Sequence, residues 1–221
     1  MATEPKLNEE TMDAMAATGC VEIRYGIESG SAAVLKRTLK GFTPEQSVEV
    51  VSAAVQRFPR VDTFFIWGFP FETMEDFYQT VFQMISFRLM GSRVLPSLLC
   101  YLPQTRIYDE YRGDPRFEFC PDLLPEYMLT GHEVCSPTGI SIDEPHRWLF
   151  DFIVEHPTIF PGFFHYDVEG NVRPKLEVLR EHGFYASPQP SEDGTESCGA
   201  HSPREPGDSR REILTRPDDI G

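Results

Sequence analysis

The sequence has few cysteines, no excess of positive charge and no long apolar run, and each shortage excludes a class of protein. Its five cysteines are odd in number and widely spaced, which fits neither a disulfide framework nor a CxxC metal site. Lys and Arg total 20 against 35 Asp and Glu, and the resulting net charge of −15 disfavours binding to nucleic acid or to an anionic membrane surface. A reducing, intracellular setting is therefore expected.

Several localisation and cofactor signatures are also missing. The N-terminus lacks the basic-then-apolar pattern of a signal peptide, and the apolar runs are shorter than the ~20 residues of a membrane helix. These features predict a soluble, cytoplasmic protein. Neither GxGxxG nor GxxxxGK[ST] occurs, so the phosphate loops of dinucleotide and nucleoside triphosphate sites are absent. The GIESG string of residues 26–30 has Glu28 where a nucleophile elbow requires serine.

What the sequence does contain is enough apolar material for one sizeable domain. Its 221 residues are 40% hydrophobic and 12% aromatic, which supports a packed core. Residues 187–221 differ, because they hold five prolines, four glycines and a net charge of −4, and we predict that they form a disordered acidic tail. The remaining charge of −11 lies on residues 1–186.

Strand-like and helix-like segments alternate over residues 1–102. The predicted strands are 21–27, 62–67 and 94–100, and the predicted helices are 8–17, 32–40, 44–57 and 74–90. Such alternation implies right-handed βαβ crossovers and a parallel sheet, with function at the carboxyl ends of the strands. The fold class is therefore α/β.

The rhythm ends near residue 103, and residues 103–186 are predicted to form an α-rich extension. Helices are expected from 143 or 144 to 155 and from 171 to 182. Aromatics and histidines at 156–166 are either a segment that covers a substrate or ordinary packing, and packing is the favoured interpretation. His132 and Glu133 form only half of an HExxH metal motif, so no metal ligand is predicted there.

Polar groups follow the first two predicted strands. Glu28, Ser29, Gly30 and Ser31 come after the first, and WGFPFET at 67–73 ends the second. The serine hydroxyls and the amides of the next helix form a possible seat for a carboxylate or phosphate, and Glu28 offers acceptors to an amine or hydroxyl. The alternative is that Gly30 and Ser31 only turn the chain and cap a helix, which is common turn chemistry.

The order of these segments is more specific than any one of them. LNEETMDAMAATGCVEIRYGIESGSAAVLKRTLKGFTPEQ, followed by FFIWGFPFETMEDF, closely resembles the second half of a radical S-adenosylmethionine (SAM) domain, over roughly residues 6–110. The nearest subgroup is often joined to a cobalamin-binding domain. The resemblance implies a partial, TIM-like βα barrel in which these strands correspond to the fourth, fifth and sixth, while the first three are absent.

The resemblance also implies a set of residues that bind the cofactor SAM. Glu28 would lie beside SAM, Lys40 would pair with its methionine carboxylate, and the GFP segment with Gly68 and Pro70 would line the adenine end. Ser29 and Gly30 belong to the same predicted site.

In two places the sequence departs from the family pattern. Lys40 replaces an arginine found in relatives, which substitutes a point charge for a bidentate fork. Phe64 stands where some relatives carry an acidic ribose ligand.

The larger departure concerns the iron–sulfur cluster. The family holds a 4Fe–4S cluster on a CxxxCxxC loop, and this spacing does not occur here. No cysteine is assigned as a metal ligand, and no catalytic residue is assigned. The hypothesis is a radical SAM enzyme that is incomplete in this chain, with an upstream polypeptide as the partner that carries the cluster; cobalamin is a further possible cofactor. The alternative is a non-catalytic remnant or partner-binding module.

Overall fold

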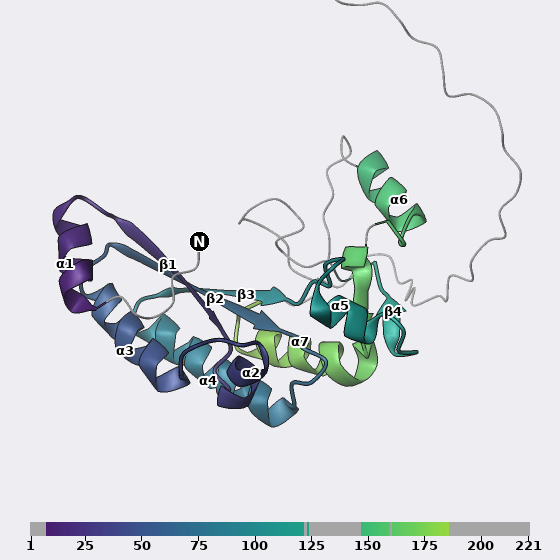
Figure 1. The fold of residues 1–221 in the computed structure, drawn as a ribbon, viewed down its shortest axis with the longest axis horizontal. Coiled ribbons are helices and arrows are strands. Elements are labelled where there is room, and N and C mark those ends of the chain that lie inside the picture. The colour runs from purple at the N-terminus through teal and green to yellow at the C-terminus, as the bar shows by residue number, and fades with distance from the viewer. Residues whose placement is uncertain (1–7, 122, 124–146, 160, 186–221) are drawn as a thin grey trace, which may run out of the picture. The chain divides into compact units, whose positions relative to one another are not determined.

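The larger sheet of the described residues has three parallel strands, with helices beside it (Figure 1). The computed structural model describes residues 8–121, 123, 147–159 and 161–185. The strands lie in the order β1 (Glu22–Glu28), β2 (Arg60–Trp67) and β3 (Arg93–Leu98). The three predicted strands are confirmed, although β3 ends at Leu98, so that Cys100 lies beyond it. The described residues form no closed barrel, so the barrel part of the predicted fold is seen only as this sheet.

Four helices of the first half follow the predicted pattern. They are α1 (Glu9–Ala17), α2 (Ala32–Arg37), α3 (Pro44–Val55) and α4 (Met74–Leu89). The threonine before each of the last two helices, Thr43 and Thr73, forms a capping box with the residue three positions later, Gln46 and Asp76 respectively. These local caps explain why the helix starts were predictable from sequence.

One face of the sheet is covered by helices that share a single apolar core. Alternate strand residues such as Tyr25, Phe65 and Trp67 point into this core, because side chains alternate between the two faces of a strand. Helix α7 (Arg173–Glu181) joins α1, α3 and α4 there, with Leu176 and Leu179 buried among them. The C-terminal extension therefore contributes to the same core as the sheet.

The extension has more varied structure than the predicted α-rich composition. It contains α5 (Arg106–Tyr111), β4 (Phe117–Phe119), α6 (Arg147–Glu155), a 3-10 turn η3 (Pro161–Phe163), β5 (Phe164–Tyr166) and a π-helical turn η4 (Val168–Val172) before α7. The antiparallel pair β4–β5 was not predicted, because three-residue strands are too short to show an alternating pattern.

Of the other predicted elements, the structure confirms two helices of the extension in whole or in part, and the predicted tail lies outside the described residues. The predicted helix at 171–182 is confirmed as η4 and α7, and α6 ends at Glu155 as expected. The predicted tail of 187–221 lies outside the described residues, and the division after residue 102 stays a prediction. Among the helices that the structure describes, none is long and apolar enough to cross a membrane.

Candidate functional site

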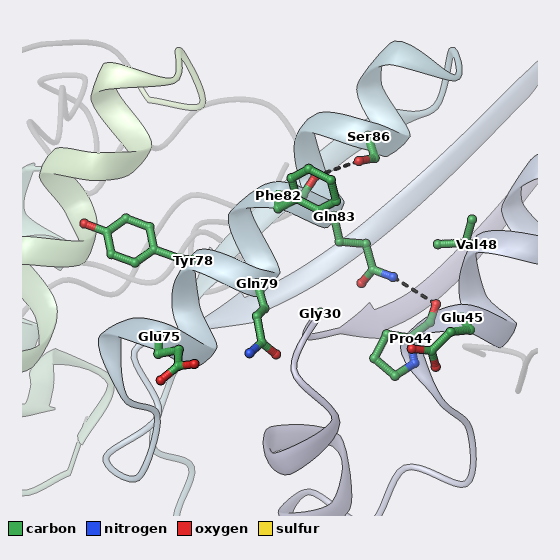
Figure 2. Close-up of a pocket in the computed structure, with 10 residues that line it drawn as sticks. All are labelled: Gly30, Pro44, Glu45, Val48, Glu75, Tyr78, Gln79, Phe82, Gln83 and Ser86. Carbon is green, nitrogen blue, oxygen red and sulfur yellow. Dashed lines mark hydrogen bonds between the residues drawn. The ribbon is translucent and has the colours of Figure 1, made fainter.

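A groove of about 520 Å³ lies between α3 and α4 (Figure 2). Tyr78 and Phe82 of α4 are among the residues that line it, and Phe82 is 73% exposed. Gln83 donates a hydrogen bond across it to the carbonyl oxygen of Pro44, over 3.1 Å. Gly30 also lines this groove, and the polar residues of the strand ends begin at that turn.

Glu28 ends β1 in an unusual backbone conformation. Its φ is 67°, and the backbone N–H of Ser29 donates to the carbonyl oxygen of Ile27 over 2.9 Å. This pattern is that of a γ-turn in which the central residue has a positive φ; such turns are rare because they are strained at residues with a Cβ atom. The β1–β2 register also shifts between Gly26 and Glu28. The carboxylate is therefore displayed at the carboxyl end of the sheet, where ligands bind in parallel α/β folds.

Lys40 reaches this carboxylate because α2 ends in a tight closing turn. Leu39 adopts a left-handed φ of 58°, and the Lys40 N–H donates to the carbonyl oxygen of Leu35 over 2.9 Å. The Lys40 Nζ atom lies 2.7 Å from Glu28 Oε1, and the two side chains are 30% and 15% exposed. An ion pair this accessible contributes only about 0–1 kcal/mol. Both side chains are therefore partly accessible to solvent.

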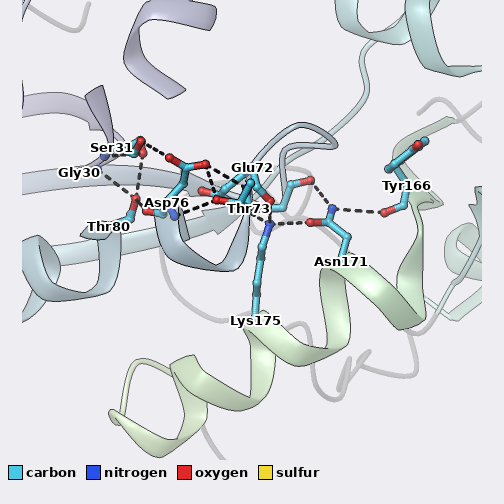
Figure 3. Close-up of polar contacts among 11 residues, drawn as sticks. Gly30, Ser31, Glu72, Thr73, Asp76, Thr80, Tyr166, Asn171 and Lys175 are labelled. Carbon is cyan, nitrogen blue, oxygen red and sulfur yellow. Dashed lines mark hydrogen bonds and ion pairs between the residues drawn. The ribbon is translucent and has the colours of Figure 1, made fainter. Parts of the chain in front are cut away.

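The turn after Glu28 is bonded to α4 rather than left open (Figure 3). Ser29 Oγ lies 2.8 Å from Thr80 Oγ1, and the Gly30 N–H donates to the same oxygen over 3.1 Å. Ser31 Oγ donates to Asp76 Oδ1 over 2.6 Å and also caps α2. The serine hydroxyls thus have partners within the protein, which agrees with the turn-and-cap interpretation. A direct contact of Ser29 or Gly30 with SAM stays a prediction.

Asp76 joins the turns that follow β1 and β2. One carboxylate oxygen accepts from Ser31, and the other accepts from the N–H and the hydroxyl of Thr73, over 3.1 and 2.6 Å. Partial burial raises the pKa of Asp76, but the hydrogen bonds from Ser31 and Thr73 outweigh it, and the pKa lies below its ordinary value. The ionised form is therefore favoured.

Gly68 and Pro70 lie in the turn after β2. Gly68 has a left-handed φ of 86°, and its N–H donates to Glu72 Oε2 over 3.1 Å. A Cβ atom at Gly68 would come within 2.9 Å of the Leu98 side chain, so both backbone conformation and space favour glycine. Pro70 is only partly buried. Their predicted contact with the adenine end of SAM stays a prediction.

A second lysine–glutamate pair, which was not predicted from the sequence, connects α7 to the turn after β2. Lys175 Nζ lies 2.8 Å from Glu72 Oε2, 2.9 Å from the Glu72 carbonyl oxygen and 2.5 Å from Asn171 Oδ1. The Asn171 amide donates to the Gly68 carbonyl oxygen over 3.1 Å. Burial raises the pKa of Glu72 and lowers that of Lys175, and in each case the partner's charge opposes the shift. One feature of the sequence could have indicated this pair: Lys175 lies on the apolar side of its helix, together with Leu176 and Leu179.

Ionic contacts also lie at the amino ends of the strands. Asp62 on β2 is fully buried and accepts two hydrogen bonds from Arg93, over 3.0 and 2.6 Å. Arg24 on β1 lies 3.6 Å away. Phe64, which takes the place of a ribose ligand in some relatives, is two residues further along β2 and is partly buried. Asp62 therefore links the three strands and is separate from the Glu28–Lys40 pair.

Two further motifs of the sequence lie in the extension, and the structure describes part of one of them. Phe163 is buried and Phe164 stacks on Phe117 at 5.3 Å, which confirms the packing interpretation for this part of residues 156–166. The motif at His132 and Glu133 lies outside the described residues. Within the described ranges, no three Cys, His, Asp or Glu residues are grouped so that they could hold a metal ion. The residues described therefore do not fit a 4Fe–4S cluster.

A comparison with protein-family models gives a match in the N-terminal part of the chain. Residues 1–84 match the model of the radical SAM superfamily, so a domain of this superfamily covers the segment that contains β1, α2, α3 and β2. The predicted resemblance is confirmed at this level. Its assignment to the cobalamin-associated subgroup stays a prediction.

Two curated relatives carry more specific names. An uncharacterized methyltransferase of Pyrococcus horikoshii is 39% identical over 74 residues, which cover 34% of this chain and 16% of that protein. A tRNA-2-methylthio-N(6)-dimethylallyladenosine synthase of Clostridium botulinum is 34% identical over 86 residues, 37% of this chain and 19% of that protein. The chain thus spans under a fifth of the length of either relative.

Proposed function

We propose that the βα half of this chain is the SAM-binding part of a radical SAM enzyme. The observation that carries the proposal is the Glu28–Lys40 pair, 2.7 Å apart and partly exposed at the carboxyl end of β1. The methionine end of SAM is a zwitterion, and a carboxylate beside an ammonium group offers a matching partner for each of its charges. Lys40 would bind the carboxylate and Glu28 the α-ammonium group.

The proposed reaction is the reductive cleavage of SAM on behalf of an unknown substrate. Bound beside a reduced 4Fe–4S cluster, SAM supplies a carbon-centred radical. This chain's own part is to bind and orient the methionine end at Glu28 and Lys40. The names of the two relatives support methyl or methylthio transfer as the reaction class, although the net charge of −15 disfavours a tRNA substrate.

The cluster is proposed to come from another polypeptide segment. The printed sequence has no CxxxCxxC, and β1 has β2 as its only strand neighbour among the described strands. Its other edge therefore offers backbone groups to a further parallel strand. After anaerobic iron–sulfur reconstitution, this chain alone should hold no stoichiometric cluster. Four irons per chain in a metal analysis would contradict that. Co-expression with a partner that carries CxxxCxxC should then produce 5′-deoxyadenosine.

The binding role of Lys40 is tested by titrating SAM into the full chain, alone and with such a partner. Lys40→Ala should raise the Kd for SAM about ten- to a hundredfold, because a hydrogen bond to a charged group is lost. Lys36→Ala is the matched control, since Lys36 is an exposed lysine in the last turn of α2, the helix that ends just before Lys40. Equal affinity of wild type and Lys40→Ala would remove the assignment.

The second candidate is a partner-binding module without catalysis, which the open edge of β1 and the missing cluster residues favour. It predicts that SAM does not bind even when a cluster-carrying partner is supplied. Cobalamin dependence stays a prediction that spectroscopy of the reconstituted complex would decide.

A further inference from the structure

The three residues that follow Glu28 are all attached to the first two turns of α4 (Figure 3). Thr80 contacts Ser29 and Gly30, and Asp76 contacts Ser31. Ser29 and Thr80 are completely buried. Gly30 packs so closely on this helix that an added Cβ atom would lie 2.6 Å from the Gln79 carbonyl oxygen. The turn and the helix therefore behave as one unit.

The directions of these hydrogen bonds follow from the atoms present. The Thr80 hydroxyl donates to the Asp76 carbonyl oxygen over 3.2 Å, which leaves its oxygen free to accept. That oxygen accepts from the Gly30 N–H and from the Ser29 hydroxyl. Ser29 Oγ in turn accepts from the Ser31 N–H over 3.1 Å. The Thr80 hydroxyl is thus the acceptor on which the buried part of the turn converges.

Glu28 needs such support because its own backbone is unfavourable. A left-handed γ-turn at a residue with a Cβ atom persists only where the surroundings determine it. Its contact with Lys40 is partly exposed and cannot supply that constraint alone. The buried contacts begin at the next residue.

We propose that Thr80 and Asp76 are positioning residues that hold Glu28 in the geometry required to bind the methionine end of SAM. The inference rests on the proposed function, but the structural coupling does not require a ligand to be tested. Asp76 also bonds to Thr73 in the turn after β2, so one helix start aligns both strand ends. A ligand that contacts both turns would find them already in register.

The experiment compares four variants of the full chain. Thr80→Val keeps the shape and removes the hydroxyl, whereas Thr80→Ser restores it. Asp76→Ala removes the acceptor for Ser31, and Glu75→Ala is its matched control, because Glu75 is an exposed acid in the same first turn. Amide hydrogen exchange at Gly30 and Ser31 is measured without ligand, with the central strand β2 as the reference for global stability.

Thr80→Val should accelerate exchange at Gly30 about five- to tenfold, as the loss of one buried hydrogen bond predicts, while Thr80→Ser stays close to wild type. The Ser31 N–H donates to Ser29 Oγ, and the Ser31 hydroxyl donates to Asp76. Asp76→Ala should therefore accelerate exchange at Ser31 by loosening its attachment to α4, whereas Glu75→Ala should not. The Kd for SAM should rise by roughly tenfold in Thr80→Val and Asp76→Ala only, the lower end of what lost supporting hydrogen bonds cost.

Unchanged exchange in folded Thr80→Val and Asp76→Ala would overturn the inference. Accelerated exchange with unchanged SAM affinity would overturn it as well, because the turn would then move without affecting the ligand. Failure of the proposed function looks different: the wild type itself would bind no SAM, while the exchange results would still decide whether α4 holds the turn. If Thr80→Val does not fold, Asp76→Ala and its control decide the question.

Discussion

Two lysine–glutamate pairs stand at neighbouring strand ends, with nearly the same separation and opposite surroundings. Lys40 and Glu28 are 2.7 Å apart after β1, and their side chains are 30% and 15% exposed. Lys175 and Glu72 are 2.8 Å apart after β2, and their side chains are 1% and 0% exposed. The two pairs therefore differ in solvent exposure and not in the distance between their charged groups.

The difference decides what each pair can do. An accessible pair has water as its alternative partner, so either charge can be exchanged for a ligand at small cost. A buried pair has no such alternative, and Lys175 fills its remaining donors with Asn171 and the Glu72 carbonyl oxygen. The first is suited to binding, whereas the second fastens the extension to the turn after β2.

Replacing the lysine of each pair by methionine tests this contrast directly. Lys175→Met should lower the free energy of unfolding by about 3–5 kcal/mol, because Glu72 is left buried without its partner. Lys40→Met should change it by about 1 kcal/mol or less. Urea denaturation of both variants measures the two values. The double variant Glu72→Gln with Lys175→Met should recover part of the loss, and similar losses in the two single variants would contradict the comparison.

A somewhat smaller effect is expected from pH, through another buried group of the extension. His165 is fully buried with Nε2 2.7 Å from the Leu123 carbonyl oxygen, and burial lowers its pKa from 6.5 to about 4. Between these values the unfolded chain binds more protons than the folded one. Stability should therefore be lost as pH falls from 6.5 towards 4, by about 3 kcal/mol in total.

The matched variant for this pH effect is His165→Gln, which keeps an N–H donor for Leu123 and does not titrate. Its unfolding free energy should fall less than that of wild type between pH 6.5 and 5, above the main range of carboxylate titration. Parallel curves for the two proteins would show that His165 does not cause the loss.

A smaller loss of stability is expected when the close contact between Gly30 and α4 is disturbed. Gly30→Ala would place a Cβ atom 2.6 Å from the Gln79 carbonyl oxygen, and the backbone must shift, at a cost of about 1–3 kcal/mol. Gly113→Ala is the control, because a Cβ atom there meets nothing within 4 Å. Thermal unfolding measures both. A Gly30→Ala protein as stable as the control would show that the turn is looser than described.

The comparison also explains which parts of the site were predictable. Glu28 and Lys40 were predicted because they belong to a segment whose order resembles a known domain, and the structure brings them into contact. The local role of Asp76 could be predicted, since it is the N3 residue of the capping box that Thr73 begins. Its bond to Ser31 could not. Lys175 and Asn171 lie about a hundred residues from Glu72 and Gly68, and no local pattern links them.

The order of strands and helices over the first hundred residues could be predicted from local patterns, because periodicity, caps and turns act between near neighbours. The lack of CxxxCxxC could likewise be seen in the sequence. Three features became visible only in the folded chain: the hydrogen bond from Gly30 to Thr80, the full burial of Lys175 beside the partial exposure of Lys40, and the pairing of β4 with β5. These features depend on burial and on partners far apart in the chain, and both are set only when the elements pack together.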